Sequence, residues 1–517
     1  MRISRRAFVA GASAAFMASP ARAQARTVLN VALPAQSIGR LDPHYATSTV
    51  DLNPIGWMFN ALVRFRPGSM NPETIESDLA ERWESSADGR VWTFALRRGV
   101  AFHGNYGTLT AEDVVFSLRR AADPQRSGFA GDYSAVDSVA ALDDHTVRIT
   151  LKENVPSLLG LVANYHGGMI VCRRALEERG VDGFAQAPIG TGPFALGELR
   201  ARQSLELVAH RPYFRGRPKL ERIVYRPIES IAARDLAYAS GEIDAVYGPT
   251  DQAWVDRMRR HPETTVDVFE PGELSSLYIN VTRPPFTDIK VRQAIAHALN
   301  REQIARFKGH DVARAAQSCI PIGYLGFTRD VPLAPFDLDR SRALLREARF
   351  PNGFTVRIVH TQSPNMLATI QVVQAQLRRV GIMLDIELVE HATFHAQIRR
   401  DLSPIVHYGA GRFPVADSYL TQFFHSRSIV GTPTAITNFS HTDIADAEID
   451  AARRATDIET QRALWATAQR KLLEQVCVVP LFEALQVWAR RASLDYGAPL
   501  EGNLSLGPAL TEATQFR

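Results

Sequence analysis

The sequence predicts a large α/β protein that also contains a β-rich part, and three observations support this fold class. Residues 223–248 and 354–390 each alternate strand, helix and strand patterns. Between about residues 60 and 185, apolar and polar residues instead alternate over short runs, which is typical of antiparallel strands. The chain has 517 residues, and this length predicts two or three domains.

The N-terminus has the features of an export signal. Ser4 to Arg6 begin a twin-arginine pattern, and Phe8 to Ala18 form an apolar run that is shorter than the ~20 residues a membrane-spanning helix needs. Ala21 to Ala23 fit a signal-peptidase site. We expect residues 1–23 to be removed. The three cysteines lie far from this site, so we expect a soluble periplasmic protein without a lipid anchor.

The charge balance argues against nucleic-acid binding. The chain has 59 basic and 55 acidic residues, and four of the arginines lie within residues 1–23. The mature chain is therefore close to neutral, whereas a general nucleic-acid binder needs many phosphate contacts from Lys and Arg.

The first α/β segment predicts two parallel strands joined by a helix. Residues 223–228 and 242–248 are the expected strands, and residues 230–240 are the expected helix between them. Gly241 stands where a helix C-terminal cap belongs. Such a unit places its strands parallel with a right-handed crossover.

The second α/β segment repeats this pattern in the other half of the chain. Strands are expected at 354–360 and 382–390, and the apolar residues between them recur at helical spacing over 365–380. Two long amphipathic helical stretches are also expected. One covers 291–304, and the other covers 445–476 in two pieces.

The β-rich part reads as antiparallel strands with tight turns. Residues 91–104 and 146–153 alternate apolar and polar side chains, as strands with one covered face do. The turn residues at 87–89 and 142–144 separate neighbouring strands.

Four blocks of the sequence resemble one protein family. Residues 41–47, 79–120, 189–228 and 291–302 are similar to the extracytoplasmic solute-binding proteins of ATP-driven importers, in the large family that binds peptides, opines and nickel complexes. The resemblance spans nearly the whole mature chain. It implies the two-lobed periplasmic binding protein fold, also called the Venus-flytrap fold, with an extra β-rich subdomain.

The resemblance also implies a domain plan. Lobe I would be discontinuous, lobe II would lie between two crossings near 270–274 and 478–484, and the crossing strands would form the hinge. The expected boundaries are 26–60, 186–270 and 483–517 for lobe I, 61–185 for the β-rich subdomain, and 271–482 for lobe II.

The function that the resemblance implies is solute capture rather than catalysis. Ligand contacts with both lobes favour the closed form, and the closed protein would deliver its ligand to an inner-membrane ABC permease. We expect a monomer without cofactor or bound metal. The expected ligand is a short peptide, or a peptide-like or opine-like solute.

The second α/β segment and the block 41–47 carry candidate ligand-binding residues. Thr361 and Gln362 follow an expected strand at the edge where α/β lobes bind ligands, although helix capping by Ser363 explains this position equally well. Tyr45 and Thr47 lie in the block 41–47, where packing at a strand end is the alternative.

Residues 407–420, HYGAGRFPVADSYL, carry the most specific candidates, Tyr408, Arg412 and Asp417. Peptide binders of the resembled family commonly place an Asp here, which pairs with the ligand's amine. This chain has Gly411 and Arg412 at that place, so the sequence predicts an anionic ligand group held by Arg412. A surface role for Arg412 is the alternative, and Asp417 is a second candidate for the missing acid.

Two other functions are less well supported. His391 and His395 are spaced four residues apart, and three more histidines follow, but no third ligand has the fixed spacing of a metal site. A nickel–chelator complex is therefore an alternative ligand. A secreted hydrolase is the second alternative, although the sequence has no G-x-S-x-G, Walker A or H-E-x-x-H motif.

Overall fold

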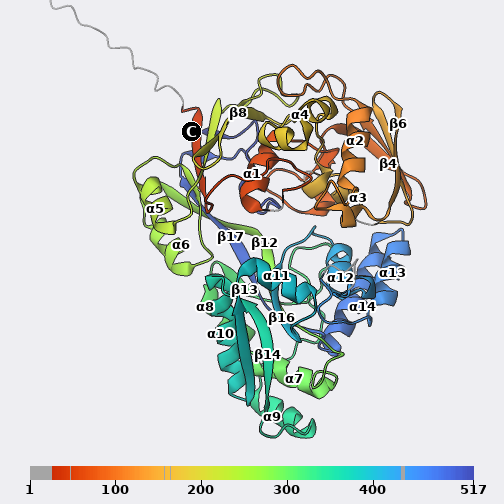
Figure 1. Cartoon of the computed structure of the whole chain (residues 1–517), viewed down its shortest axis with the longest axis vertical. Helices are drawn as coiled ribbons and strands as arrows, with labels where there is room; N and C mark the ends of the chain where they lie inside the picture. Colours follow the sequence, from red (N-terminus) through yellow and green to blue (C-terminus); the bar gives the residue numbers. More distant parts are fainter. Residues whose placement is uncertain (1–25, 47, 156–157, 164, 432–436) are drawn as a thin grey trace, which may run out of the picture.

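The structure is a computed structural model that describes residues 26–517 except 47, 156–157, 164 and 432–436. The expected signal, residues 1–23, lies outside the described residues. The chain forms two bodies, one above the other in Figure 1, joined at the centre by strands β12 and β17. Both bodies mix helices and strands, so the predicted α/β class is confirmed.

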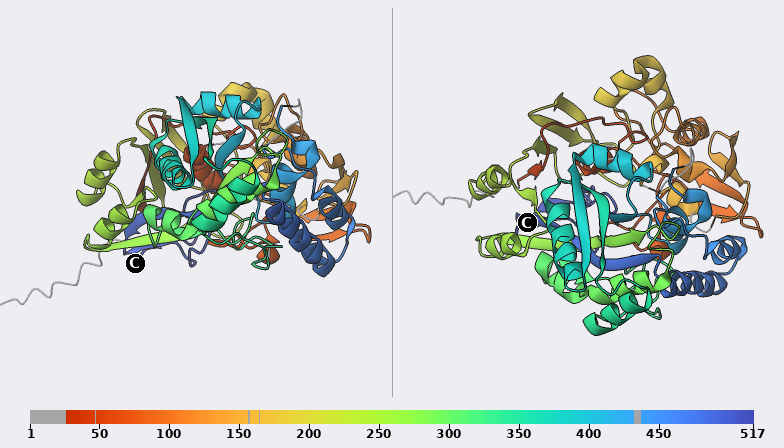
Figure 2. Two further views of the ribbon diagram at one scale, coloured as in Figure 1. Left: turned by 90° about the horizontal axis from the view of Figure 1, so that it is seen from below. Right: turned by 60° about the horizontal axis from the view of Figure 1, so that its bottom comes forward.

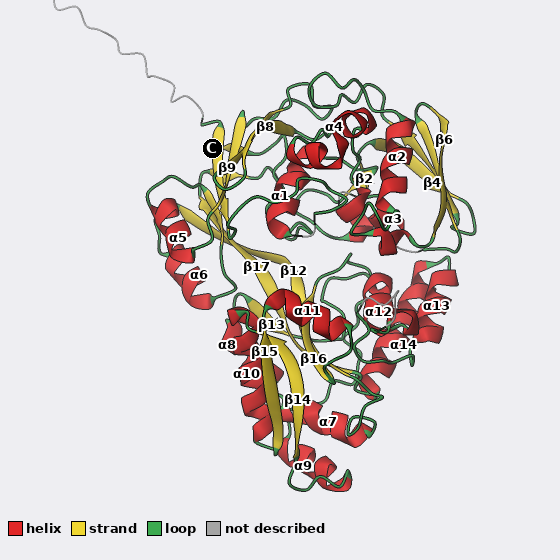
Figure 3. Ribbon diagram, in the orientation of Figure 1, coloured by secondary structure: helices red, strands yellow, loops and turns green. Residues whose placement is uncertain are grey.

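The main sheet runs through both bodies. Its order is β16-β12-β17-β11-β1-β10-β9-β8, and β13 also pairs with β17. The long strands β12 and β17 are antiparallel neighbours and connect the two halves (Figures 2 and 3). The bounds are β1 Val28–Leu33, β8 Phe194–Arg200, β9 Ser204–Ala209, β10 Arg222–Pro227, β11 Ala245–Tyr247, β12 Thr264–Ile279, β13 Ala313–Ala315, β16 Ile405–Ala410 and β17 Val478–Arg491.

The two crossings predicted from the sequence fall within these long strands. Residues 270–274 belong to β12 and residues 478–484 belong to β17. The register between the two strands shifts between Phe269 and Glu273, and such an irregularity re-aims the side chains that follow it. The lobe boundaries given above remain a prediction.

The upper body contains a separate antiparallel sheet of order β4-β5-β7-β6, as the alternating patterns predict. Helix α2, Ala111–Ala121, packs on this sheet. The upper body also contains the short pair β2–β3 and five further helices, and β18–β19 lie near the C-terminus. Their bounds are β2 Val63–Arg64, β3 Glu76–Ser77, β4 Ala80–Ser85, β5 Val91–Leu96, β6 Val136–Asp143, β7 Thr146–Leu151, β18 Leu494–Asp495, β19 Gln515–Phe516, α1 Thr49–Met58, α3 Leu158–Leu161, α4 Arg173–Gln186, α5 Ile231–Ala239 and α6 Gln252–Arg259.

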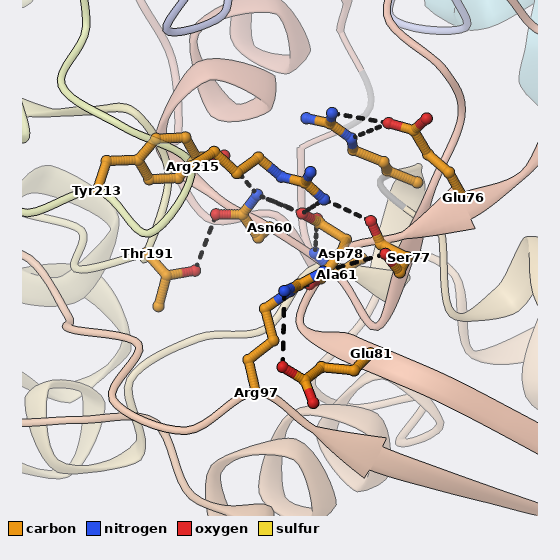
Figure 4. A network of polar contacts seen from close by, with 11 residues as sticks. Asn60, Ala61, Glu76, Ser77, Asp78, Glu81, Arg97, Thr191, Tyr213 and Arg215 are labelled. Carbon is orange, nitrogen blue, oxygen red and sulfur yellow. Dashed lines mark hydrogen bonds and ion pairs between the residues drawn. The ribbon is translucent and has the colours of Figure 1, made fainter.

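A buried polar network ties the β-rich sheet to the rest of the upper body (Figure 4). Asp78 is fully enclosed and accepts hydrogen bonds from Asn60 and from the backbone of Ala61, both at about 3 Å. Arg215, which follows β9, pairs with the same carboxylate at 3.2 Å. Buried carboxylates persist only with such partners, so this network fixes how the β-rich part joins its lobe.

The lower body is built around the parallel pair β14 (Phe354–Thr361) and β15 (Ile382–Val389), as the second α/β segment predicts. Its helices are α7 Ile289–Ala298, α8 Arg301–Lys308, α9 Leu338–Glu347, α10 Pro364–Arg378, α11 His391–Arg399, α12 Ala416–Phe424, α13 Asp446–Arg454 and α14 Ile458–Glu474. The predicted two-piece helix is confirmed as α13 and α14.

The single helix expected over 291–304 is wrong. The chain leaves the helical conformation at Leu299, and the side chain of Asn300 accepts a hydrogen bond from the backbone of Gln303 at 2.9 Å. Asn is among the strongest N-terminal caps because its side chain replaces a missing backbone acceptor. The apolar spacing continues across this cap, so periodicity alone conceals the break.

Two further properties concern the described part of the chain. Cys172, Cys319 and Cys477 are all free and buried. Among the described residues, no helix is both long and apolar enough to cross a membrane.

Candidate functional site

Arg412 lies in the loop between β16 and α12, and its backbone is held in place. Its N–H donates to the Tyr324 hydroxyl, and that hydroxyl donates to the Arg412 carbonyl oxygen, each at 2.7 Å. The side chain Nε donates to Gln422 at 2.5 Å, and the guanidinium lies over the Phe423 ring, 5.0 Å from its centroid. These contacts position the guanidinium on a rigid wall of the lower body.

No acidic side chain among the described residues neutralises Arg412 at ion-pair distance, although the chain has 55 acidic residues. Its side chain donates hydrogen bonds to the amide oxygen of Gln422 and to the carbonyl oxygen of Gly411. A guanidinium that is half-buried without a counter-charge is costly, and an anionic ligand group would remove that cost.

Glu273 on β12 is the acid that Arg412 influences. Surrounding protein raises the pKa of the Glu273 carboxyl by desolvation, and Arg412 acts against this rise. Glu273 is nevertheless exposed to solvent, so its carboxyl is accessible to a ligand. It can therefore accept a cationic group of a ligand while Arg412 holds an anionic one.

Two tyrosines of the upper body are influenced electrostatically by this pair of charges. Burial raises the pKa of Tyr165, which lies in the β-rich part, and Arg412 acts against this rise. Burial likewise raises the pKa of Tyr247 at the end of β11, with Glu273 adding to it. We call Arg412, Glu273, Tyr408, Tyr165 and Tyr247 the inter-lobe site. Because β12 carries Glu273, both bodies and a crossing strand contribute to it.

The two bodies are in direct contact around the inter-lobe site. The ring of Phe413 lies 5.6 Å from that of Phe65, and Asn154 donates to the carbonyl oxygen of Arg453 at 2.9 Å. Arg462 of α14 pairs with Glu73 at 2.6 Å. The structure therefore shows the two bodies closed on each other.

Comparison with known proteins places the chain in a family. Residues 74–430 match the profile described as bacterial extracellular solute-binding proteins, family 5, middle region. The chain belongs to this family. Heme-binding protein A of Haemophilus influenzae is 27% identical over 460 residues, with 82% of this chain and 81% of that protein covered. Di/tripeptide-binding protein 2 of Pseudomonas aeruginosa is 29% identical over 465 residues, with 84% and 86% covered.

A solved structure is more similar still. The binding protein MoaA of A. tumefaciens R10, in complex with mannopinic acid, superposes with a TM-score of 0.85 at 50% sequence identity, covering 95% of this chain and 100% of that one. The predicted two-lobed periplasmic binding protein fold is confirmed, and the two bodies are its lobes. The family 5 relatives are binding proteins, which confirms that this chain is not an enzyme.

The structure brings only part of the sequence-predicted site together in this family 5 protein. Tyr408 is half-buried beside Arg412, with its ring 5.4 Å from that of Phe439. Thr361 and Gln362 lie at the end of β14 as expected, but Thr361 is fully buried while Gln362 is exposed. Ser363 stands at the N-cap of α10, yet its side chain makes no capping hydrogen bond.

The remaining predicted residues have other surroundings. Asp417 is buried, and its carboxylate accepts from Arg453 at 2.9 Å. Its charge is thus already neutralised, and it does not replace the missing acid. Tyr45 donates to the carbonyl oxygen of Gln125 and lies under the guanidinium of Arg40. Thr47 lies outside the described residues.

Sequence reasoning missed Glu273, Tyr165 and Tyr247. Glu273 belongs to the stretch 270–274, which was interpreted only as a crossing. Glu273 directly precedes the buried run Leu274 to Ile279, and an acid beside such a run is a usable signal because buried segments rarely carry acids without a partner.

A concave region lies beside the crossing strands. It is a cavity of about 640 Å³ that contains neither Arg412 nor Glu273. Arg314 at its wall is already paired with Glu270 at 2.9 Å and with Glu483 at 2.7 Å. Both arginines that line this cavity, Arg314 and Arg462, are already paired with carboxylates, so Arg412 of the inter-lobe site is the better candidate for binding an anionic ligand. Its lining residues are Ser69, Met70, Asn71, Glu73, Val268, Phe269, Glu270, Arg314, Gly323, Tyr324, Leu325, Gly326, Phe327, Arg462, Leu485, Glu501 and Gly502.

Closure of the family 5 lobes can be tested at Gly160 in α3. A Cβ added there would lie 2.4 Å from the Phe413 ring of the other lobe. We expect Gly160→Ala to weaken solute binding about tenfold, because overpacking at this contact disfavours only the closed form. Titration calorimetry measures the affinity. The melting temperature without solute should stay unchanged.

Gly56→Ala is the matched control, because a Cβ at that helical glycine meets nothing within 4 Å. Wild-type affinity in Gly160→Ala would contradict a bound state in which the lobes meet at Phe413.

Proposed function

We propose that this family 5 protein is the binding subunit of an ABC importer and captures an acidic, opine-type solute between its lobes. The observation that carries the proposal is Arg412, a cation fixed at the inter-lobe site without an acidic partner among the described residues. A carboxylate is the group that a guanidinium binds best, through two parallel hydrogen bonds.

The comparison supports the same ligand class. MoaA, half of whose residues are identical in the aligned chains, was solved with mannopinic acid. Glu273 extends the argument, because a solute derived from an amino acid carries an amine as well as a carboxylate. Glu273 would accept the amine, and Arg412 would hold the carboxylate.

Capture would follow from the closed geometry. A solute that contacts Arg412 of one lobe and Tyr165 of the other gains both contacts only when the lobes close, so its binding shifts the population toward the closed form. A solute bound with micromolar affinity supplies roughly 8 kcal/mol at standard state, which is enough to dominate a gap of a few kcal/mol between forms.

The proposal also includes export of the chain to the periplasm and delivery of the solute to a permease. Residues 1–23 would direct the chain to the periplasm through the twin-arginine pattern, and the closed, loaded protein would be recognised by an inner-membrane permease. The family description, extracellular solute binding, supports this assignment.

A ligand panel tests the proposal. Protein without a polyhistidine tag is titrated by calorimetry and thermal shift with mannopinic acid, a zwitterionic dipeptide and a neutral polyol. We expect a saturable rise in melting temperature with the acid and none with the polyol, because only the acid supplies a partner for Arg412. Preference for the dipeptide over the acid would replace the opine-type solute with a peptide. Binding of the polyol alone would reject the ionic site.

The variant Glu273→Gln tests the contribution of the Glu273 charge separately from that of Arg412. We expect about tenfold weaker binding of an acid that carries an amine, since one charged hydrogen bond of ~1.4 kcal/mol is lost. An acid without an amine should bind the variant and the wild type equally. The side chain is exposed, so folding should be unaffected, and equal loss for both ligands would contradict the role given to Glu273.

A further inference from the structure

Two histidines on α11 face each other with their ring nitrogens. His391 and His395 lie four residues apart on this helix, and their Nε2 atoms are 3.2 Å apart. The rings are nearly perpendicular, with an interplanar angle of 80°. Side chains four residues apart lie on one face of a helix, so both nitrogens lie on the same side of α11.

This spacing fits two nitrogen ligands of one metal ion. Imidazole nitrogens bind at about 2.0–2.1 Å, which puts two of them roughly 3.3–3.4 Å apart on a tetrahedral ion and about 2.9 Å apart on a square-planar one. The observed separation of 3.2 Å lies between these values. Without metal, the same pair is held by one N–H···N hydrogen bond, and metal binding would require His395 to carry its proton on Nδ1, so that both Nε2 lone pairs are available to the ion.

A buried hydroxyl orients the first of these histidines. The Oγ1 of Thr361 lies 3.1 Å from His391 Nδ1, and Thr361 is fully enclosed at the end of β14. Thr361 Oγ1 also accepts the backbone N–H of Ser363, and its second lone pair can accept His391 Nδ1–H. That tautomer leaves the lone pair of Nε2 free. Metal-binding histidines characteristically donate their other ring N–H to such a neighbour.

The surroundings suit a metal ion that arrives from solution. His391 is exposed, and the His395 ring packs edge-on against Tyr408 of the inter-lobe site, with centroids 5.8 Å apart. No third His, Cys, Asp or Glu completes a cluster within the described residues, so water or a bound molecule would fill the other positions.

We propose that His391 and His395 form a two-imidazole site for a first-row divalent metal ion beside the inter-lobe site. Imidazole ligands favour Cu²⁺, Ni²⁺ and Zn²⁺, whereas Mg²⁺ and Ca²⁺ require oxygen ligands. The metal ion binds at the two Nε2 atoms, and Thr361 is the positioning residue.

The test uses tag-free, full-length mature protein and the metal ions alone. Calorimetric titration with NiCl₂ and CuCl₂ is expected to show one site per chain, and the Cu²⁺-loaded protein should show an electron paramagnetic resonance spectrum of two nitrogen ligands. His391→Ala and His395→Ala should each weaken binding at least about tenfold, and Thr361→Val should weaken it by about 10- to 100-fold.

His310→Ala is the matched control, because His310 is strongly exposed and lies outside α11. It should bind the metal ions like wild type. Unchanged binding in both α11 variants would overturn the proposal, and so would a spectrum with no nitrogen ligand pair. Melting curves of the variants without metal verify folding. Because no organic solute is present, the result is independent of the ligand panel for the inter-lobe site.

Discussion

Replacing Arg412 by alanine is expected to weaken binding of an acidic solute about a hundredfold. Removing one partner of an enclosed, hydrogen-bonded charge pair costs roughly 2–5 kcal/mol, and each 1.4 kcal/mol is a factor of ten. Arg412 is held by Tyr324 and Gln422 before any ligand arrives, so its binding geometry needs no reorganisation. Titration calorimetry of the acid that gives the largest thermal shift measures the loss.

Two further variants test whether the expected loss comes from the guanidinium of Arg412. Arg412→Lys keeps the charge but loses the planar pair of donors, so we expect an intermediate loss of about tenfold. Arg306→Ala removes an exposed arginine of the same lobe and should bind like wild type. Wild-type affinity of Arg412→Ala for every acidic solute would remove the anion site and leave Arg412 as a packing residue over Phe423.

The sequence predicted two residues of the inter-lobe site, Arg412 and Tyr408, and missed the others. Arg412 stood out because it occupies the place where the resembled family commonly has an acid, and that comparison uses one short stretch of the chain. Glu273 lies about 140 positions earlier in the chain, and its role depends on β12 pairing with β16, which no local pattern shows. Tyr165 joins the site only because the lobes close.

Contacts between side chains that are distant in the sequence or set by the fold explain the other differences between prediction and structure. Asp417 looked like a ligand-binding acid, but Arg453 of α13 neutralises it across 36 positions. His391 and His395 were set aside as a metal pair because the sequence offers no third ligand, whereas the structure shows how close their nitrogens lie. The α/β units were predicted well, because strand and helix periodicities are local properties.

The largest expected effect on stability lies at the crossing strands. Arg314 of β13 donates to Glu483 of β17 at 2.7 Å and pairs with Glu270 of β12 at 2.9 Å. Glu483 is fully buried. Removing a charge from a buried ion pair leaves its partner uncompensated, so we expect Arg314→Ala to lower the free energy of unfolding by about 3 kcal/mol. Denaturant unfolding at neutral pH measures this loss.

The loss should depend on pH in a defined direction. Burial raises the pKa of Glu483, and Arg314 acts against this rise. A carboxyl whose pKa is raised on folding contributes stability at low pH and loses it as the pH rises through the folded-state pKa. Without Arg314 the pKa of Glu483 should rise further. The variant should therefore lose more stability at pH 7.5 than at pH 5.

A second substitution identifies the group responsible. Adding Glu483→Gln to Arg314→Ala removes the uncompensated charge, so the double variant should be more stable than Arg314→Ala at pH 7.5 and should lose most of the pH dependence. A pH-independent loss in Arg314→Ala would instead point to packing of the arginine side chain. Glu483 also accepts the backbone N–H of Ile322 at 2.9 Å, so the same carboxylate joins a crossing strand to a lobe II loop. The ionisation of Glu483 therefore affects the stability of the hinge formed by the crossing strands.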